Sequence, residues 1–209
     1  MAVLVLLFDL RVADAHPHVF VDGGVSFVLD DHGALTALEV TWHYDLFETL
    51  YALSSLDILP EPDGSLSPEN RQRISDFMTD WPEGFGGSAH LSISDQKYEV
   101  SRPTSMEVSL IKGNLVMRFH RHLAEPVAMA GRTAEVGFYE ATYFYAFTAT
   151  KTPRIHGADA ECTADLIPFD PDVELEALQV SLFDLGREDT PETPNIGSLF
   201  ADRIVLECD

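Results

Sequence analysis

Short segments in which apolar and polar residues alternate recur along most of this chain, and the pattern restricts it to a largely antiparallel β fold. The first two segments, residues 18–31 and 33–45, are separated only by a turn at Asp31, His32 and Gly33, and so predict a β-hairpin. The remaining alternating segments, each bounded by turn residues, are residues 89–95, 97–101, 104–113, 114–123, 132–140, 143–149 and 200–209, with a tight hairpin expected at Lys112-Gly113-Asn114.

About three helices are predicted among these strands. Asp45 opens the first in a capping-box-like sequence, and Ser67 followed by Pro68 is typical of the start of the second. Residues 170–186 fit both the helical and the strand period, but their Asp-Pro-Asp start and closing glycine favour a third helix. Since neither a repeat nor a linker interrupts the chain, we predict a single α+β domain over residues 16–209, predominantly antiparallel β-sheet.

The charge of the chain narrows the classes of function. Its 209 residues carry a formal net charge of -22, which repels phosphate backbones and anionic membrane surfaces, so no nucleic-acid binding is expected. No apolar stretch approaches the roughly 18 residues that span a bilayer, so no direct membrane insertion is expected either. The acidity attracts cations, although such acidity is usually only a solvated surface.

The N-terminus resembles a secretory signal. A short apolar run over residues 2–8 precedes the A-x-A cleavage pattern that ends at Ala15, so residues 1–15 are predicted to be a signal peptide and His16 the first residue of an exported protein. No Lys or Arg precedes the run, and Asp9 and Arg11 interrupt its end; a start codon assigned too far downstream accounts for the missing basic region. The alternative is a buried first strand.

The two cysteines agree with export. Cys162 and Cys208 are the whole cysteine content and form no C-x-x-C pattern. A lone distant pair in an oxidising compartment is most simply one disulfide, whereas in the cytosol the same residues would be buried thiols.

The residues that follow the predicted cleavage site could bind a metal ion. A free amine and imidazole at His16 can chelate one ion together, and His18 supplies a second imidazole. Pro17 has no amide hydrogen, which excludes the square-planar copper/nickel motif that requires a deprotonated amide at the second position. A solvated N-terminal tail is the alternative.

Further metal-ligand candidates lie along the chain. His43 and Asp45 combine imidazole and carboxylate, although Asp45 could simply cap its helix. His120 and His122 share one strand face and are alternative ligands, but the neighbouring Arg118 and Arg121 would repel a cation. Glu140 lies among aromatic residues, where a carboxylate needs a partner. The remaining histidines, His32, His90 and His156, fit turns or strand edges and receive no role.

Four stretches, HPHVFVD, TWHYDLFETLYAL, FYEATYFYAF and ETPNIGSLFADRIVLEC, together resemble a periplasmic family known as domain of unknown function 1007, often labelled an ABC-type transport component. The resemblance covers essentially the whole chain after the predicted signal. Trp42 and Asp45 match the family's W-x-F/M-D pattern, with His43 and Tyr44 between them. Where the family has Asp-Pro before two tyrosines, this chain has Glu140 followed by alanine, which retains a carboxylate in a different local geometry.

The resemblance implies a function. Family members commonly accompany a nickel/cobalt-type membrane permease and are linked to zinc acquisition, so this chain would be a periplasmic accessory protein that binds zinc, or nickel or cobalt, for such a permease. His16, His18, His43, Asp45 and Glu140 would be its ligands. Two alternatives stay open: an oxidative enzyme in which an N-terminal histidine forms a copper brace, with His120 or His122 as third ligand, and an interaction module without metal. The usual hydrolase, metalloprotease and nucleotide-binding motifs are absent from the sequence.

Overall fold

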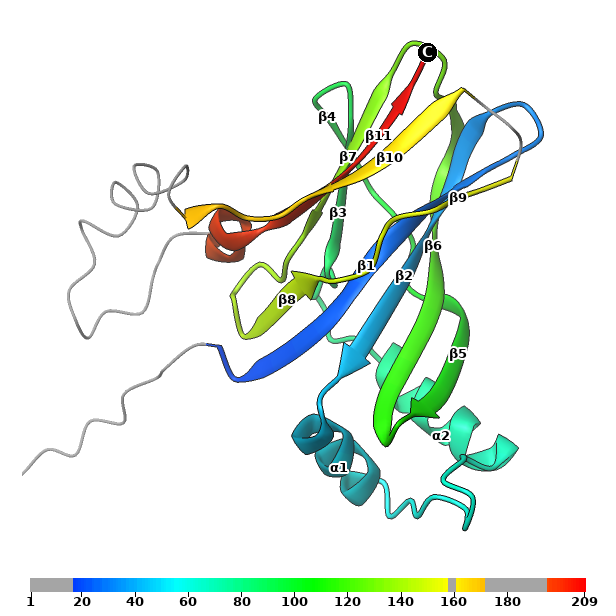
Figure 1. The fold of residues 1–209 in the computed structure, drawn as a ribbon, viewed down its shortest axis with the longest axis vertical. Helices are drawn as coiled ribbons and strands as arrows, with labels where there is room; N and C mark the ends of the chain where they lie inside the picture. The colour runs from blue at the N-terminus through cyan, green and yellow to red at the C-terminus, as the bar shows by residue number, and fades with distance from the viewer. Residues whose placement is uncertain (1–16, 158–160, 172–194) are drawn as a thin grey trace, which may run out of the picture.

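The computed structural model describes residues 17–157, 161–171 and 195–209, and they form two β-sheets that face each other (Figure 1). We call the six-stranded sheet, in the order β5-β6-β2-β1-β8 with β9 also paired to β1, sheet A. The five-stranded sheet, in the order β10-β11-β7-β3-β4, is sheet B. Sheet A contains β1 (Val19–Leu29), β2 (Ala34–Tyr44), β5 (Thr104–Ile111), β6 (Asn114–Ala128), β8 (Tyr145–Ala149) and β9 (Ile155–His156).

Sheet B contains β3 (Ala89–Ile93), β4 (Gln96–Tyr98), β7 (Thr133–Phe138), β10 (Cys162–Ile167) and β11 (Asp202–Cys208). Nearly all neighbouring strands are antiparallel, as predicted; β8 and β9 run parallel to β1. The predicted first hairpin is confirmed as β1 and β2, and its turn is fixed by Asp30, whose carboxylate accepts hydrogen bonds from the amides of His32 and Ala34. The predicted second hairpin turns at Lys112 and Gly113, whose positive φ angles of 53° and 86° match a two-residue hairpin turn.

Alternation places one face of each strand in the core. On β2, Leu38, Val40 and Trp42 point inward, and on β7 Ala134, Val136 and Phe138 do the same from the opposite sheet. The two sheets meet through aromatic rings. In sheet A the ring centroids of Trp42 and Phe147 lie 5.3 Å apart, and the Phe147 centroid lies 5.2 Å from that of Phe138 in sheet B. Glu39, Thr41 and His43, which alternate with these residues, therefore lie on the outer face of sheet A.

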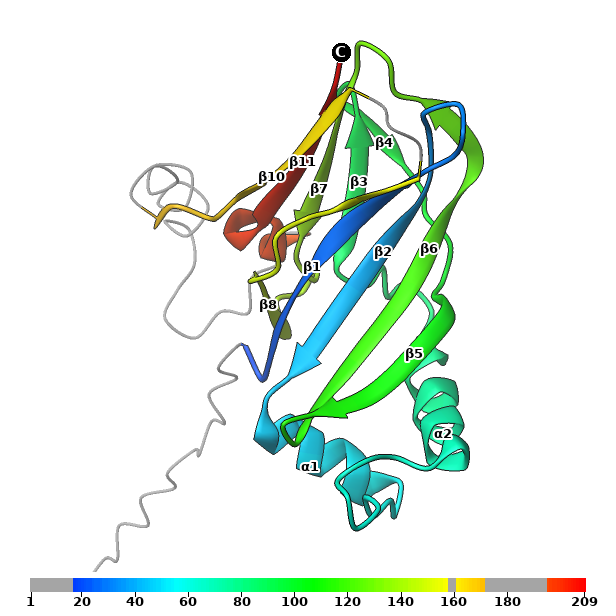
Figure 2. The same cartoon turned by 45° about the vertical axis from the view of Figure 1, so that its right-hand side comes forward.

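Two α-helices lie at one end of sheet A (Figure 2). The first, α1 (Leu46–Ser55), begins where predicted, because the Asp45 carboxylate accepts a hydrogen bond from the Glu48 amide. The second, α2 (Pro68–Thr79), is capped by Ser67 as predicted. The third predicted helix, residues 170–186, lies almost entirely outside the described residues. The described residues contain, in addition, a short 3-10 helix, η1 (Ile196–Phe200).

The predicted disulfide between Cys162 and Cys208 is present, and the two residues are register partners on β10 and β11 with Cα atoms 4.0 Å apart. No helix in the described part of the chain is long and apolar enough to cross a membrane.

Candidate functional site

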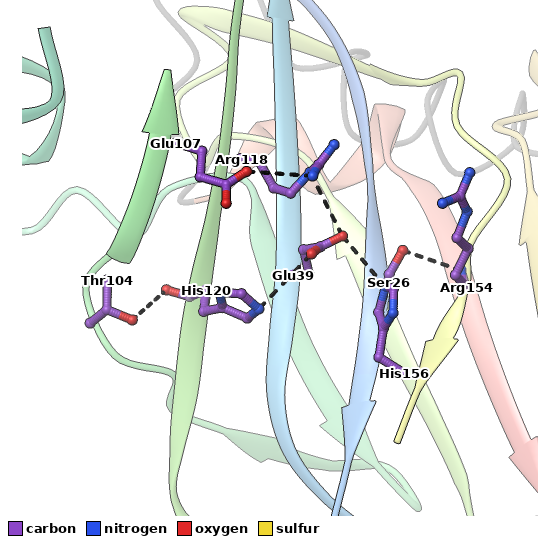
Figure 3. A network of polar contacts seen from close by, with 8 residues as sticks. All are labelled: Ser26, Glu39, Thr104, Glu107, Arg118, His120, Arg154 and His156. Atoms are coloured by element: carbon purple, nitrogen blue, oxygen red, sulfur yellow. Dashed lines mark hydrogen bonds and ion pairs between the residues drawn. The ribbon is translucent and has the colours of Figure 1, made fainter. Parts of the chain in front are cut away.

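The outer face of sheet A carries a group of ionisable side chains around Glu39, shown in Figure 3. We call Glu39, Glu107, Arg118, His120 and His156 the Glu39 cluster. These residues come from four strands, β2, β5, β6 and β9, that are distant in sequence. Strand register explains their convergence, because Glu39 is the partner of Ser26 on β1 and of His120 on β6.

Strand β9 brings His156 to the cluster. It pairs in parallel with β1, and His156 is the partner of Val28. The Arg154 carbonyl accepts a hydrogen bond of 2.9 Å from the Phe27 amide, while the Arg154 amide donates to Ser26 Oγ at 3.2 Å. Gly157 then passes so close to the chain that a Cβ would overlap the Leu29 carbonyl oxygen, and its φ of 111° suits glycine. These contacts fix the point at which the His156 ring enters the outer face.

Two imidazoles approach the Glu39 carboxylate from opposite sides (Figure 3). His156 Nε2 lies 3.5 Å from Glu39 Oε1, and His120 Nε2 lies 4.0 Å from Glu39 Oε2. His156 Nε2 is buried yet makes no hydrogen bond within the described part of the chain, so the 3.5 Å contact is not one. A buried ring nitrogen without a partner is costly, which makes this atom the natural place to look for a ligand.

Arg118 shares the same carboxylate. Its Nε lies 4.0 Å from Glu39 Oε1, and its guanidinium lies 3.5 Å from Glu107 Oε2. With both histidines neutral, the two carboxylates exceed the single guanidinium by one negative charge. The cluster therefore attracts a cation even with Arg118 present.

The alternative ligands His120 and His122 do lie on one face of β6, with ring centroids 6.1 Å apart. The charge argument against them is wrong for Arg121, because alternation turns its side chain to the opposite, buried face of β6. Arg118 does share their face, but it is compensated by Glu39 and Glu107.

The N-terminal candidates are only partly described. His16 lies outside the described residues. His18 precedes β1; its amide donates to the Phe144 carbonyl at 2.9 Å, and its ring lies 4.9 Å from the Phe144 ring. Glu140 lies in the loop between β7 and β8 that also contains Phe144. It is buried, and its carboxylate accepts hydrogen bonds from the Thr142 amide, the Thr142 hydroxyl and the Phe144 amide. The partner that this carboxylate requires is thus the loop itself.

The other two candidates lie at the end of β2. Asp45 caps α1, which is the alternative to a ligand role that the sequence left open for this residue. His43 lies on the outer face of sheet A opposite Asp22, and its buried Nε2 makes no hydrogen bond within the described residues. Within residues 17–157, 161–171 and 195–209, no three His, Cys, Asp or Glu side chains are placed so that they could hold a metal ion as they stand.

Sequence reasoning missed Glu39 and His156. Glu39 has no signal beyond its place in an alternating segment, and the two-residue strand of His156 gives no periodic signal. What identifies both is the register of β1, β2, β6 and β9, which depends on pairing across the whole chain.

A groove of about 650 Å³ lies on sheet B, and His90 is among its lining residues. The His90 ring stacks on Tyr139 at 4.0 Å, and Nε2 lies 3.0 Å from the Tyr139 carbonyl oxygen, to which it donates as the Nε2–H tautomer. Burial lowers the pKa of His90, and the nearby Arg121 charge lowers it further, although the bond to Tyr139 opposes both.

The lowered pKa of His90 predicts a loss of stability in acid. Because the folded protein disfavours the charged ring, the stabilisation is complete above the unfolded pKa of about 6.5 and is lost as the pH falls below it. We expect the free energy of unfolding, measured in urea at pH 7.5 and pH 5.0, to fall less in His90→Gln than in wild type. His32→Gln, in an exposed turn, is the control; an unchanged pH dependence in His90→Gln would contradict the prediction.

Comparison with known proteins agrees with the resemblance seen in the sequence. An uncharacterized protein of Haemophilus influenzae (strain ATCC 51907 / DSM 11121 / KW20 / Rd) is 25% identical over 198 residues, which cover 93% of this chain and 92% of the relative. The family described as "Protein of unknown function (DUF1007)" matches residues 1–208. The chain therefore belongs to the DUF1007 family.

Proposed function

We propose that this protein is an exported binding protein for a divalent transition metal, zinc in the first place, and that it serves a membrane permease of the nickel/cobalt type. The observation that carries the proposal is the Glu39 cluster, in which two imidazoles approach the two oxygens of one carboxylate on an accessible sheet face. The disulfide supports export, since such bonds persist in oxidising compartments. The permease rests on the family resemblance.

The spacing in the cluster suits a bridging ion better than direct hydrogen bonds. A tetrahedral zinc ion with bonds of about 2.0–2.1 Å holds its ligand atoms about 3.3 Å apart. The separations of 3.5 Å and 4.0 Å from the Glu39 oxygens lie just above that value. The His120 side chain is 32% exposed, and its ring would have to turn toward His156 for both imidazoles to reach one ion. Glu39, His120 and His156 would be three ligands, leaving a fourth position for water or His122.

The N-terminal histidines would form a separate site. His120 is level with Ser26, and the seven residue steps from Val19 to Ser26 extend about 23 Å along β1. His18, which precedes Val19, is therefore a strand length away from His120 and His122. A copper brace requires its third histidine close to the first, so this arrangement favours the metal-binding protein over the oxidative enzyme. The remaining alternative is an interaction module that binds no metal, and metal titration distinguishes it from the proposed function.

Metal titration of matched variants tests the proposal. We expect zinc to bind the metal-free protein, and the paired change His120→Ala with His156→Ala to weaken binding at least about 100-fold, tenfold for each lost imidazole. Glu39→Gln should cost about tenfold, because the amide keeps the shape and loses the charge. Binding should release protons and weaken in acid, since imidazole binds metal only when neutral. Isothermal titration with zinc, nickel and cobalt measures these effects.

The controls separate the two candidate sites. His32→Ala removes an exposed turn histidine and should leave the affinity unchanged. Changing His16 and His18 together to alanine should also leave the Glu39 site intact. If the N-terminal pair alone abolishes binding, the metal site lies there; if no variant changes the affinity, or wild type binds no metal, the proposed function is wrong.

A further inference from the structure

Helix α1 exposes a row of large apolar side chains. Leu46 is 57% exposed, Phe47 74%, Leu50 57% and Tyr51 66%. Because residues four apart share a helix face, the pairs 46/50 and 47/51 form one continuous surface, which we call the α1 outer face. Single exposed apolar residues are ordinary, but four adjacent ones on a helix of ten residues indicate a surface that another molecule covers.

The opposite face of α1 already fixes the helix to the protein. Thr49, Ala52 and Leu53 are buried, and the Thr49 hydroxyl accepts a hydrogen bond of 2.8 Å from the Leu115 amide on β6. The helix therefore does not need its outer face for packing. These four side chains are available for contact with a partner without any unfolding of α1.

Charge at the start of α1 indicates the chemistry of that partner. Asp45 and Glu48 flank the outer face, and within the described residues neither carboxylate lies within 4.0 Å of a cationic group. Partial burial, and secondarily Asp45, raises the pKa of Glu48. No Lys or Arg occurs between Arg11 and Arg71, so the surrounding sequence is exclusively acidic. Among the described cations, Arg73 donates to the Leu56 carbonyl at the other end of the helix, and Lys112 lies in the β5–β6 turn that precedes Leu115.

We propose that the α1 outer face docks a protein segment that presents its own apolar helix face flanked by Lys or Arg. Apolar contact with Leu46, Phe47, Leu50 and Tyr51 would supply most of the affinity, and cations of the partner would meet Asp45 and Glu48. A second copy of this chain would instead bring two acidic rims together, and an anionic membrane would be repelled by a net charge of -22. Charge complementarity thus selects a basic partner.

A synthetic helical peptide with a leucine face and flanking lysines is the probe. We expect it to bind the purified protein in fluorescence anisotropy, more tightly at 50 mM than at 300 mM salt, whereas the same peptide with glutamate for lysine should not bind. Phe47→Ser with Tyr51→Ser leaves the net charge and the buried face unchanged and should weaken binding at least about tenfold. Glu48→Gln should weaken it about two- to threefold at low salt only.

Phe77→Ser is the matched control, because Phe77 is an aromatic residue of α2 that is 53% exposed. It should bind the peptide as tightly as wild type, so that weaker binding by the Phe47/Tyr51 variant, which has the same net charge, can be assigned to the α1 outer face and not to attraction to the acidic protein as a whole. Equal binding by the Phe47/Tyr51 variant, or binding of the glutamate peptide, would overturn the proposal. Two other results would also overturn it: a wild-type dimer in sedimentation that the Phe47/Tyr51 variant does not form, or wild-type binding to neutral lipid vesicles that this variant loses. None of these changes touches the Glu39 cluster, so the metal proposal stands or falls separately.

Discussion

Replacement of Arg121 by methionine is expected to lower the free energy of unfolding by about 3–5 kcal/mol. Arg121 is only 6% exposed, yet within the described residues no carboxylate oxygen lies within 4.0 Å of its guanidinium. Its guanidinium instead donates four hydrogen bonds to backbone carbonyls, those of Gly86, Ala89, Val100 and Ser101. Each carbonyl that loses its donor away from water costs about 1–3 kcal/mol, although the change also removes a buried charge.

The position of Arg121 explains why other residues would not replace it. The guanidinium lies over the Trp81 ring, 5.2 Å from its centroid, and joins β6 to two loops that flank β3 and β4. Burial lowers the pKa of Arg121 to about 10, so the side chain stays charged at neutral pH. Lysine has three donors on one atom and cannot reach four carbonyls in this arrangement, so Arg121→Lys should lose roughly half as much stability.

Urea unfolding followed by tryptophan fluorescence measures this effect, since Trp81 reports on the site itself. Arg118→Met is the matched control: the neighbouring outward-facing arginine is 53% exposed, and its loss should change the free energy of unfolding by less than about 0.5 kcal/mol. Equal effects of the two substitutions would show that the backbone contacts of Arg121 contribute little.

Removal of the disulfide is expected to have the second large effect. Cys162 and Cys208 are 46 residues apart, and closing a loop of that length stabilises the folded state by about 4 kcal/mol in the chain-entropy estimate. The bond joins β10 to the last strand, β11, and β10 is the edge strand of sheet B with half-exposed residues. Without the bond, this edge should open more readily.

The double change Cys162→Ser with Cys208→Ser avoids a leftover thiol. We expect its free energy of unfolding in urea to lie about 2–4 kcal/mol below that of the oxidised wild type. Wild type treated with reductant should match the double variant. A difference below about 0.5 kcal/mol would contradict the expectation that the bond stabilises the folded state by restricting the unfolded chain.

Much of the fold could be predicted from the sequence because its determinants are local. The turn after Asp30, the caps at Asp45 and Ser67, and the Lys112-Gly113 turn each depend on a few neighbouring residues. The alternation of β6 predicted that His120 and His122 share a face. The same alternation, applied one residue further, also shows that Arg121 faces the opposite way.

The candidate site was harder to predict because it depends on long-range pairing. Glu39 and His156 are 117 positions apart and meet only through β1, which pairs with both of their strands. Glu140 shows the reverse problem: its aromatic surroundings indicated a need for a partner, but only coordinates show that its own loop supplies the donors. Local patterns identify which residues are polar and buried; register decides which of them meet.

The location of bound zinc is the measurement that tests the central claim most directly. A crystal of the protein grown with one equivalent of zinc, and measured at the zinc absorption edge, gives the position of the ion in an anomalous difference map. The expected result is one strong peak on the outer face of sheet A, within about 2.1 Å of Nε2 of His120, Nε2 of His156 and an oxygen of Glu39. A peak at His16 and His18 instead, or no ordered zinc at all, would contradict the assignment of the Glu39 cluster.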